Sequence, residues 1–210
     1  MNGAPARLVV LASGGGRTLV NLQRAIEDGR LHAEIVVVIV SRADLKARER
    51  AQELGLATLV LGPQSHPDRA QRERLTIGAI LEARPDLVVL AGWLQLLPIP
   101  AELEGKVLNI HPALLPAYGG KGYYGSRVHE AVVADGVPVS GCTVHFATSA
   151  YDEGPVLMQT AVPVLAEDDA DALASRVFAA ECATYPRALQ HLIDGDAWWE
   201  DGVVHWRTEA

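Results

Sequence analysis

The chain has 210 residues, of which 49% are apolar and 21% are charged, as in an ordinary globular domain. Its formal charge is -8, with 18 Lys and Arg against 26 Asp and Glu, whereas proteins that bind nucleic acid or acidic membrane surfaces usually carry the opposite balance. Apolar runs such as 35–40 are too short to span a bilayer, and two cysteines make neither a disulfide framework nor a zinc cluster. We therefore expect one soluble, cytoplasmic domain over residues 1–210.

Short apolar runs alternate with amphipathic segments in the first half of the chain. The runs predict buried strands at 8–12, 35–40, 59–61, 87–91 and 107–110, and the segments between them predict helices at 18–27, 43–54 and 69–83. Asp44 and Asp68 are candidate N-caps for the second and third of these helices. The alternation predicts an α/β fold with a mostly parallel, Rossmann-like sheet and helices on both faces.

The pattern changes after residue 110. A stretch rich in Pro, Gly and Tyr is followed by an expected helix at 126–134, two strands at 139–146 and 155–163, and a long helix at 169–193. The two strands predict antiparallel additions to the sheet. Pro186 is expected to kink or split the long helix.

Three consecutive glycines, Gly14, Gly15 and Gly16, lie between the first strand and the first helix and precede Arg17 and Thr18. Glycine lets a backbone approach a ligand closely, and the amides and dipole at a helix start attract an anion. The spacing matches neither a P-loop nor a dinucleotide fingerprint. The turn therefore indicates a phosphate site, with a plain tight turn as the alternative.

Asn109 and His111 come at the end of the fifth strand, where open α/β sheets place their ligands. Residues two apart on a strand point to the same side, so both side chains can reach one substrate carbonyl. An amide donates to an oxyanion, and an imidazole donates or moves a proton. Asp152 lies 41 positions further on, in a sequence that by itself indicates a turn. Beside His111 it would favour the imidazolium and raise the pKa of the ring.

Five segments in order resemble the folate-dependent phosphoribosylglycinamide formyltransferases of purine biosynthesis. They read LASGGG at 11–16, VLAGWLQLL at 89–97, LNIHPALLP at 108–116, GCTVHF at 141–146 and DEGPVL at 152–157. The resemblance extends from about residue 8 to about residue 192. It implies the formyltransferase fold and formyl transfer from 10-formyltetrahydrofolate to the amine of glycinamide ribonucleotide.

The resemblance also implies roles for individual residues. Asn109, protonated His111 and Asp152 match the catalytic residues of that family, and Gly15, Gly16, Arg17 and Thr18 match its phosphate-binding turn. Glu181 matches an acidic residue that holds the ribose hydroxyls of the acceptor. The folate contacts match Arg69, Leu94, Gln95, Leu96, Leu97 and the flap that holds Thr148 and Tyr151.

This chain departs from the family pattern at the phosphate turn, which is two residues longer than usual. Arg17, Thr18 or Asn21 can therefore take the place of the family's Asn, and we favour Arg17 because a guanidinium suits a phosphate dianion. Phe178 replaces a polar residue near the phosphate, and the longer loop at 117–125 brings Lys121 as another candidate for the anion. That loop is either a lid or a simple extension.

The sequence says less about the other histidines, a metal and the identity of the acceptor. His145 is expected to support the site or the strand, and His129 is expected to face solvent. No His, Asp and Glu spacing fits a catalytic metal, so we expect none. Small-molecule substrates without nucleic-acid or membrane partners are expected, in a monomer or homodimer. A sugar-nucleotide amine is an alternative acceptor, whereas the tRNA-directed relative needs a further domain. A phosphate-binding module without chemistry is disfavoured because binding alone needs no imidazole beside an amide.

Overall fold

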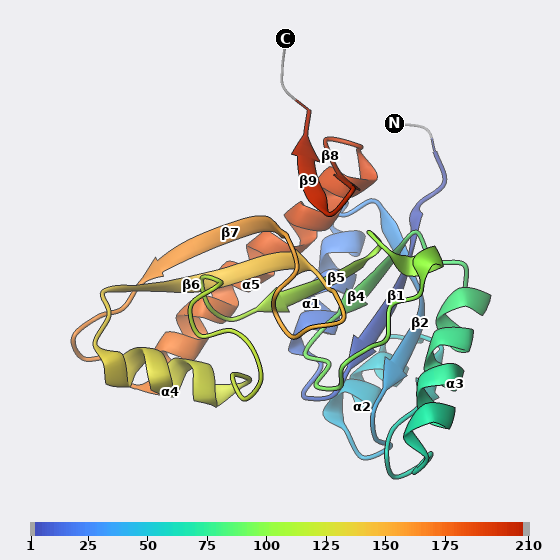
Figure 1. Cartoon of the computed structure of the whole chain (residues 1–210), viewed down its shortest axis with the longest axis horizontal. Coiled ribbons are helices and arrows are strands. Elements are labelled where there is room, and N and C mark those ends of the chain that lie inside the picture. Colours follow the sequence, from blue (N-terminus) through green and yellow to red (C-terminus); the bar gives the residue numbers. More distant parts are fainter. Residues whose placement is uncertain (1–2, 208–210) are drawn as a thin grey trace. The chain divides into compact units, whose positions relative to one another are not determined.

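The computed structural model describes residues 3–207 (Figure 1). The chain forms two compact units, which contain residues up to Leu108 and residues from Asn109 onward. The prediction of a single domain over the whole chain stays a prediction. Among the described residues, no helix combines the length and apolar character that crossing a bilayer requires.

The first unit is a parallel α/β layer. Its strands β1 (Ala6–Ala12), β2 (Ala33–Val40), β3 (Thr58–Val60) and β4 (Leu87–Leu90) follow one another in the spatial order β3-β2-β1-β4, and all the pairings between them are parallel. The crossovers hold α1 (Arg17–Glu27), α2 (Lys46–Glu53) and α3 (Arg69–Glu82), and the short helix η1 (Ala101–Leu103) follows β4. Val9, Val38 and Val88 are fully buried, as expected of strands covered on both faces.

Two helix starts in this unit differ in how they are capped. The Asp68 carboxylate accepts a hydrogen bond from the Gln71 amide at 2.6 Å, so the expected cap of α3 is confirmed. The expected cap at Asp44 is wrong, because α2 starts after Leu45 and Asp44 pairs with Arg42 instead. Leu45 is buried and Asp44 is exposed, so burial of the apolar side chain sets where α2 begins.

The second unit combines an antiparallel strand pair with a long helix. Strand β5 (Val107–His111) crosses the boundary between the units, and α4 (Ser126–Asp135), β6 (Val139–Phe146), β7 (Val156–Pro163) and α5 (Ala170–Ile193) follow. Strands β6 and β7 pair antiparallel, and α5 contacts both of them as well as α4. Parallel strands in the first unit and antiparallel strands in the second confirm the predicted fold class.

Three features of this unit differ from the sequence predictions: the long helix, the C-terminal hairpin and His129. Helix α5 is continuous through the buried Pro186, and its N-cap is Asp169, which accepts from the Ala172 amide. The hairpin of β8 (Ala197–Glu200) and β9 (Val203–Trp206) was not predicted. His129 on α4 is buried, so the expectation that it faces solvent is wrong. It follows Val128 and precedes Val132 by three positions, which places it beside the apolar stripe of the helix.

Candidate active site

Asn109, His111 and Asp152 lie together in the second unit, as the sequence predicts. The Asn109 Nδ2 atom is 3.4 Å from Asp152 Oδ1, and His111 Nδ1 is 3.5 Å from Asp152 Oδ2. His111 is buried, whereas Asn109 and Asp152 are half-buried. Asp152 therefore lies between the two side chains that end β5.

The loop between β6 and β7 delivers Asp152 to this position. The Phe146 amide donates to the Pro155 carbonyl at 3.0 Å, which closes the base of the loop. Gly154 approaches the Phe146 carbonyl so closely that a Cβ atom there would lie 1.7 Å from the oxygen, so only glycine fits. Asp152 has a φ of 58°, in the left-handed region that Asp tolerates better than most residues.

Both ring nitrogens of His111 face hydrogen-bond acceptors. Nδ1 faces the Asp152 carboxylate, and Nε2 lies 2.7 Å from the Tyr118 carbonyl oxygen. Because a carbonyl only accepts, Nε2 carries a proton. Burial lowers the pKa of His111 below 6.5 and outweighs the opposing effects of Asp152 and the Tyr118 carbonyl. The expected net rise in this pKa is therefore wrong, although Asp152 does pull it upward.

Asp152 is held as a carboxylate. Burial raises its pKa, but the neighbouring His145 and His111 and the Gly120 amide together bring it below its usual value. The Gly120 amide donates to Oδ2 at 3.0 Å. An ionised carboxylate beside His111 stabilises any positive charge that develops on the ring during a reaction.

His145, which the sequence predicts to support the site or the strand, lies in direct contact with the cluster. It is 1% exposed, and its Nε2 atom lies 3.1 Å from Asn109 Nδ2 and 3.6 Å from Asp152 Oδ1. The signal that points to it is a histidine between two large apolar residues, Val144 and Phe146, at the end of the buried strand β6. His129, on α4, is also buried. Its pKa is lowered mainly by burial and to a smaller extent by the nearby His111.

Hydrogen bonds fix the first half of the loop that follows β5. Thr143 Oγ1 donates to the Ala113 carbonyl at 2.7 Å and accepts from the Leu115 amide at 3.0 Å. Further along, the Tyr118 hydroxyl donates to Asp135 at 2.9 Å. Lys121, one candidate for the phosphate, is exposed at the tip of this loop.

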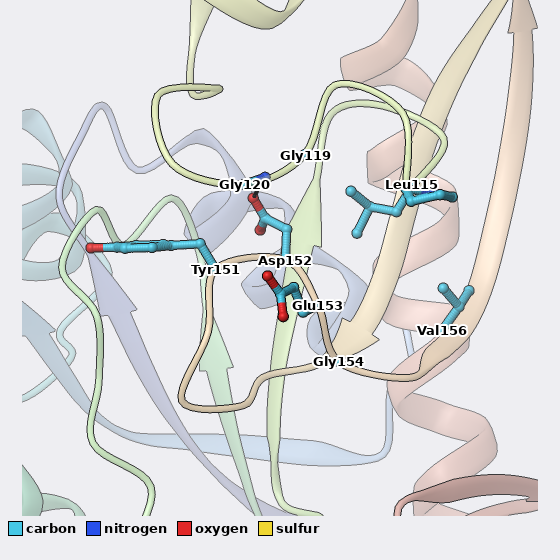
Figure 2. A pocket seen from close by; sticks show the side chains of 9 residues that line it. Leu115, Gly119, Gly120, Tyr151, Asp152, Glu153, Gly154 and Val156 are labelled. Atoms are coloured by element: carbon cyan, nitrogen blue, oxygen red, sulfur yellow. Dashed lines mark hydrogen bonds between the residues drawn. The ribbon is translucent and has the colours of Figure 1, made fainter.

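An open cavity of about 480 Å³ lies between this loop and the loop that holds Asp152 (Figure 2). Leu115 and Val156 supply apolar walls, and Asp152 points toward the backbone of Gly119 and Gly120. The predicted flap residue Tyr151 also lines the cavity and is 40% exposed. The cavity therefore offers a space beside the cluster in which an acyl group and an amine can meet.

The glycine turn of the first unit has the features of an anion site. Gly16 has a φ of 74° and precedes α1, and no side chain caps that helix start. The Gly15 carbonyl accepts from Arg50 at 2.5 Å. Arg17 is exposed and Thr18 is half-buried. The start of α1 thus presents backbone amides without a side-chain cap, and residues 17 and 18 lie at this helix start.

The remaining predicted ligand contacts fall on both units. Leu94 is 51% exposed, and the Gln95 side chain accepts from Arg72 Nε at 3.0 Å, a contact that sequence analysis missed. Arg69 pairs with Glu73 one turn later on α3. In the second unit, Glu181 is half-buried on α5, and Thr148 is half-buried in the loop after β6. Within residues 3–207, no group of three or more His, Cys, Asp or Glu side chains is placed to hold a metal ion.

Comparisons with known proteins identify the family to which the chain belongs. A family model described as formyl transferase matches residues 6–189. The chain is 36% identical to a chloroplastic phosphoribosylglycinamide formyltransferase of Vigna unguiculata, over 94% of this chain and 64% of that protein. It is 35% identical to the phosphoribosylglycinamide formyltransferase of Escherichia coli K12, over 93% of each. The chain thus spans less than two thirds of the Vigna protein.

A solved structure extends the likeness to the fold. The crystal structure of glycinamide ribonucleotide transformylase 1 from Symbiobacterium toebii matches with a TM-score of 0.88 at 35% identity, and the match covers 98% of this chain and 95% of that one. This likeness confirms the predicted formyltransferase fold. Because the family model covers most of the chain and the Escherichia coli relative matches along nearly its whole length, the chain belongs to the formyl transferase family.

Proposed function

We propose that this protein transfers the formyl group of 10-formyltetrahydrofolate to the amine of glycinamide ribonucleotide. The observation that carries the proposal is the contact of Asp152 with both Asn109 and His111 beside an open cavity. The names of the relatives support the choice of acceptor. An amide, an imidazole and a carboxylate in contact suit acyl transfer, because the reaction forms an oxyanion and moves a proton.

In the proposed reaction the acceptor amine attacks the formyl carbon and forms a carbon–nitrogen bond. The formyl oxygen takes the electron pair, and Asn109 Nδ2 and the His111 ring donate to this oxyanion. The oxyanion then collapses, and the bond from carbon to the folate nitrogen breaks. The proton lost by the amine passes through a water beside Asp152 to the leaving nitrogen.

The resting state of His111 refines this proposal. Because burial lowers its pKa, the ring of the free protein is mainly neutral at pH 7. The oxyanion supplies a negative charge next to the ring, and Asp152 supplies a second. Both negative charges favour the imidazolium. His111 is therefore proposed to be protonated when the oxyanion forms.

The acceptor's phosphate is proposed to bind the amides of Gly15 and Gly16 with Arg17 and Thr18. Asn21 and Lys121 are the alternative partners of the anion. Glu181 is proposed to hold the ribose hydroxyls. The folate is proposed to contact Arg69, the backbone of Leu94, Gln95, Leu96 and Leu97, and the flap that holds Thr148 and Tyr151.

We further propose that the enzyme works in the cytoplasm without a metal, as a monomer or homodimer. Its partners are proposed to be small-molecule substrates, with no nucleic-acid or membrane partner.

The test is a formyl-transfer assay with 10-formyltetrahydrofolate as donor. Glycinamide ribonucleotide and an aminosugar nucleotide are supplied as acceptors in parallel, and the formylated products are measured by mass spectrometry. Formylation of glycinamide ribonucleotide with much higher kcat/KM supports the proposal. Preference for the aminosugar nucleotide, or no transfer to either acceptor, contradicts it.

A further inference from the structure

The two ring nitrogens of His145 have different partners. Nδ1 lies 3.0 Å from the Phe146 carbonyl oxygen, and Nε2 lies 3.1 Å from Asn109 Nδ2. A carbonyl oxygen only accepts hydrogen bonds, so the proton of the ring belongs on Nδ1. In the neutral ring, Nε2 then carries a lone pair and accepts from the Asn109 amide.

The Asn109 amide is oriented by two acceptors on one side. Its Nδ2 atom faces His145 Nε2 at 3.1 Å and Asp152 Oδ1 at 3.4 Å, and these two acceptors are themselves 3.6 Å apart. An amide nitrogen has two hydrogens, so it can serve both acceptors at once. A half-turn of the amide would instead place Oδ1 against a lone pair and a carboxylate oxygen, and all three groups would repel one another.

From this arrangement we infer that His145 is a positioning residue, which fixes the amide of Asn109 with Nδ2 toward the reacting centre. The inference rests on the proposed function, because it assigns Asn109 the oxyanion. When the oxyanion forms, Nδ2 exchanges its longer contact, to Asp152, for the substrate oxygen. The contact to His145 stays and holds the amide in place, so the donor needs no reorientation during the reaction.

Substitutions can separate this role from simple packing. Gln at position 145 extends its amide oxygen about as far as the Nε2 atom of histidine, whereas Asn reaches only as far as Nδ1. His145→Gln therefore keeps an acceptor for Asn109, and His145→Asn removes it while it keeps a polar group near the Phe146 carbonyl. His205→Asn, on the β8–β9 hairpin, is the matched histidine substitution outside the cluster.

We expect His145→Asn to lower kcat for formyl transfer by about tenfold or more, the equivalent of one hydrogen bond. The KM of each substrate should change by less than about threefold. His145→Gln recovers most of the loss, and His205→Asn matches the parent protein. Equal losses in His145→Gln and His145→Asn, a loss in KM rather than kcat, or full activity of His145→Asn overturn the inference. Circular dichroism and thermal unfolding confirm that each variant is folded.

A second measurement does not depend on turnover. Long-range ¹H–¹⁵N NMR correlations distinguish the two tautomers of histidine, and the His145 signals are identified by their loss in His145→Gln. A ring protonated on Nδ1 and bare at Nε2 supports the inference, and a proton on Nε2 overturns it. If the parent protein formylates no acceptor, the proposed function fails, and the tautomer still decides whether His145 orients Asn109.

Discussion

The carbonyl oxygen of Tyr118 lies 2.7 Å from Nε2 of His111. The loop that contains Tyr118 also donates the Gly120 amide to Asp152. The free protein thus satisfies the polar atoms of its own cluster with backbone groups of this loop. In the proposed reaction the formyl oxygen replaces the Tyr118 carbonyl as the acceptor of the Nε2 hydrogen, so we expect turnover to involve local rearrangement at residues 118–120.

Removal of either proposed oxyanion donor should impair the chemical step. We expect Asn109→Ala and His111→Ala each to lower kcat about 10²–10³-fold, because an oxyanion donor acts mainly in the transition state. The KM of both substrates should change little. Steady-state kinetics with each substrate varied in turn check this, and near-normal kcat in both variants contradicts the proposed mechanism.

Removal of Arg17, the proposed partner of the phosphate, should weaken binding of glycinamide ribonucleotide and leave binding of the folate unchanged. We expect Arg17→Ala to raise the KM for glycinamide ribonucleotide roughly tenfold or more, since a charge-assisted hydrogen bond is worth about 1.5–3 kcal/mol. The KM for the folate should stay near its original value. Arg24→Ala, at the other end of α1, is the control. An equal rise in both KM values would place Arg17 elsewhere in the site.

The glycine turn should tolerate a methyl group at one position and not at another. Gly16 has a φ of 74°, and a Cβ atom there would lie 2.6 Å from Ala47 Cα. Gly14 has open space at the same point. We expect Gly16→Ala to lower the free energy of unfolding by roughly 1–3 kcal/mol and Gly14→Ala by less than about 0.5 kcal/mol. Urea denaturation of the two variants measures the difference, and equal stability would contradict the close approach.

Buried His129 should make the protein less stable in mild acid. Burial, and then the proximity of His111, lowers its folded-state pKa below 6.5, so below that pH the unfolded chain binds more protons than the folded one. Its contribution to stability is therefore present above about pH 6.5 and is lost as the pH falls. The slope from one such group is at most about 1.4 kcal/mol per pH unit.

His129→Gln should flatten this dependence. The free energy of unfolding is measured by urea denaturation at a series of pH values between about 5 and 8, in the range where an unfolded histidine titrates. His111 has a lowered pKa for the same main reason and keeps part of the slope in the variant. An unchanged slope in His129→Gln would show that His129 takes up a proton without cost in the folded protein.

Most of the fold could be predicted because its strands are buried on both faces. Runs such as Ala33–Val40 contain almost no polar residues, and the sequence therefore marks them clearly. The hairpin at 197–206 was missed because its strands are only four residues long and half-exposed. Such short strands show no clear alternation of apolar and polar residues, and their tryptophans indicate only that the segment packs. The start of α2 was misplaced because burial of Leu45 outweighed the local preference of Asp44 for a cap.

The candidate site could be predicted only where its residues share a strand or match a family pattern. Asn109 and His111 are two apart on β5, so spacing alone puts them on one side. Contact of Asp152 with His111 depends on how a loop 41 positions later folds, and only the resemblance suggested it. The net lowering of the His111 pKa depends on burial, which no motif specifies.

The close approach of Gly154 to Phe146 has a consequence for redesign of the cavity. The base of the loop at 147–155 is fixed by this contact and by the Phe146–Pro155 hydrogen bond, whereas Ser149 and Tyr151 at its tip are exposed. Substitutions or insertions at the tip can therefore reshape the wall that a substrate meets while Asp152 keeps its distance from His145. Under the proposed function the loop would thus separate folate binding from catalysis, and libraries aimed at altered folate donors are best confined to residues 148–151.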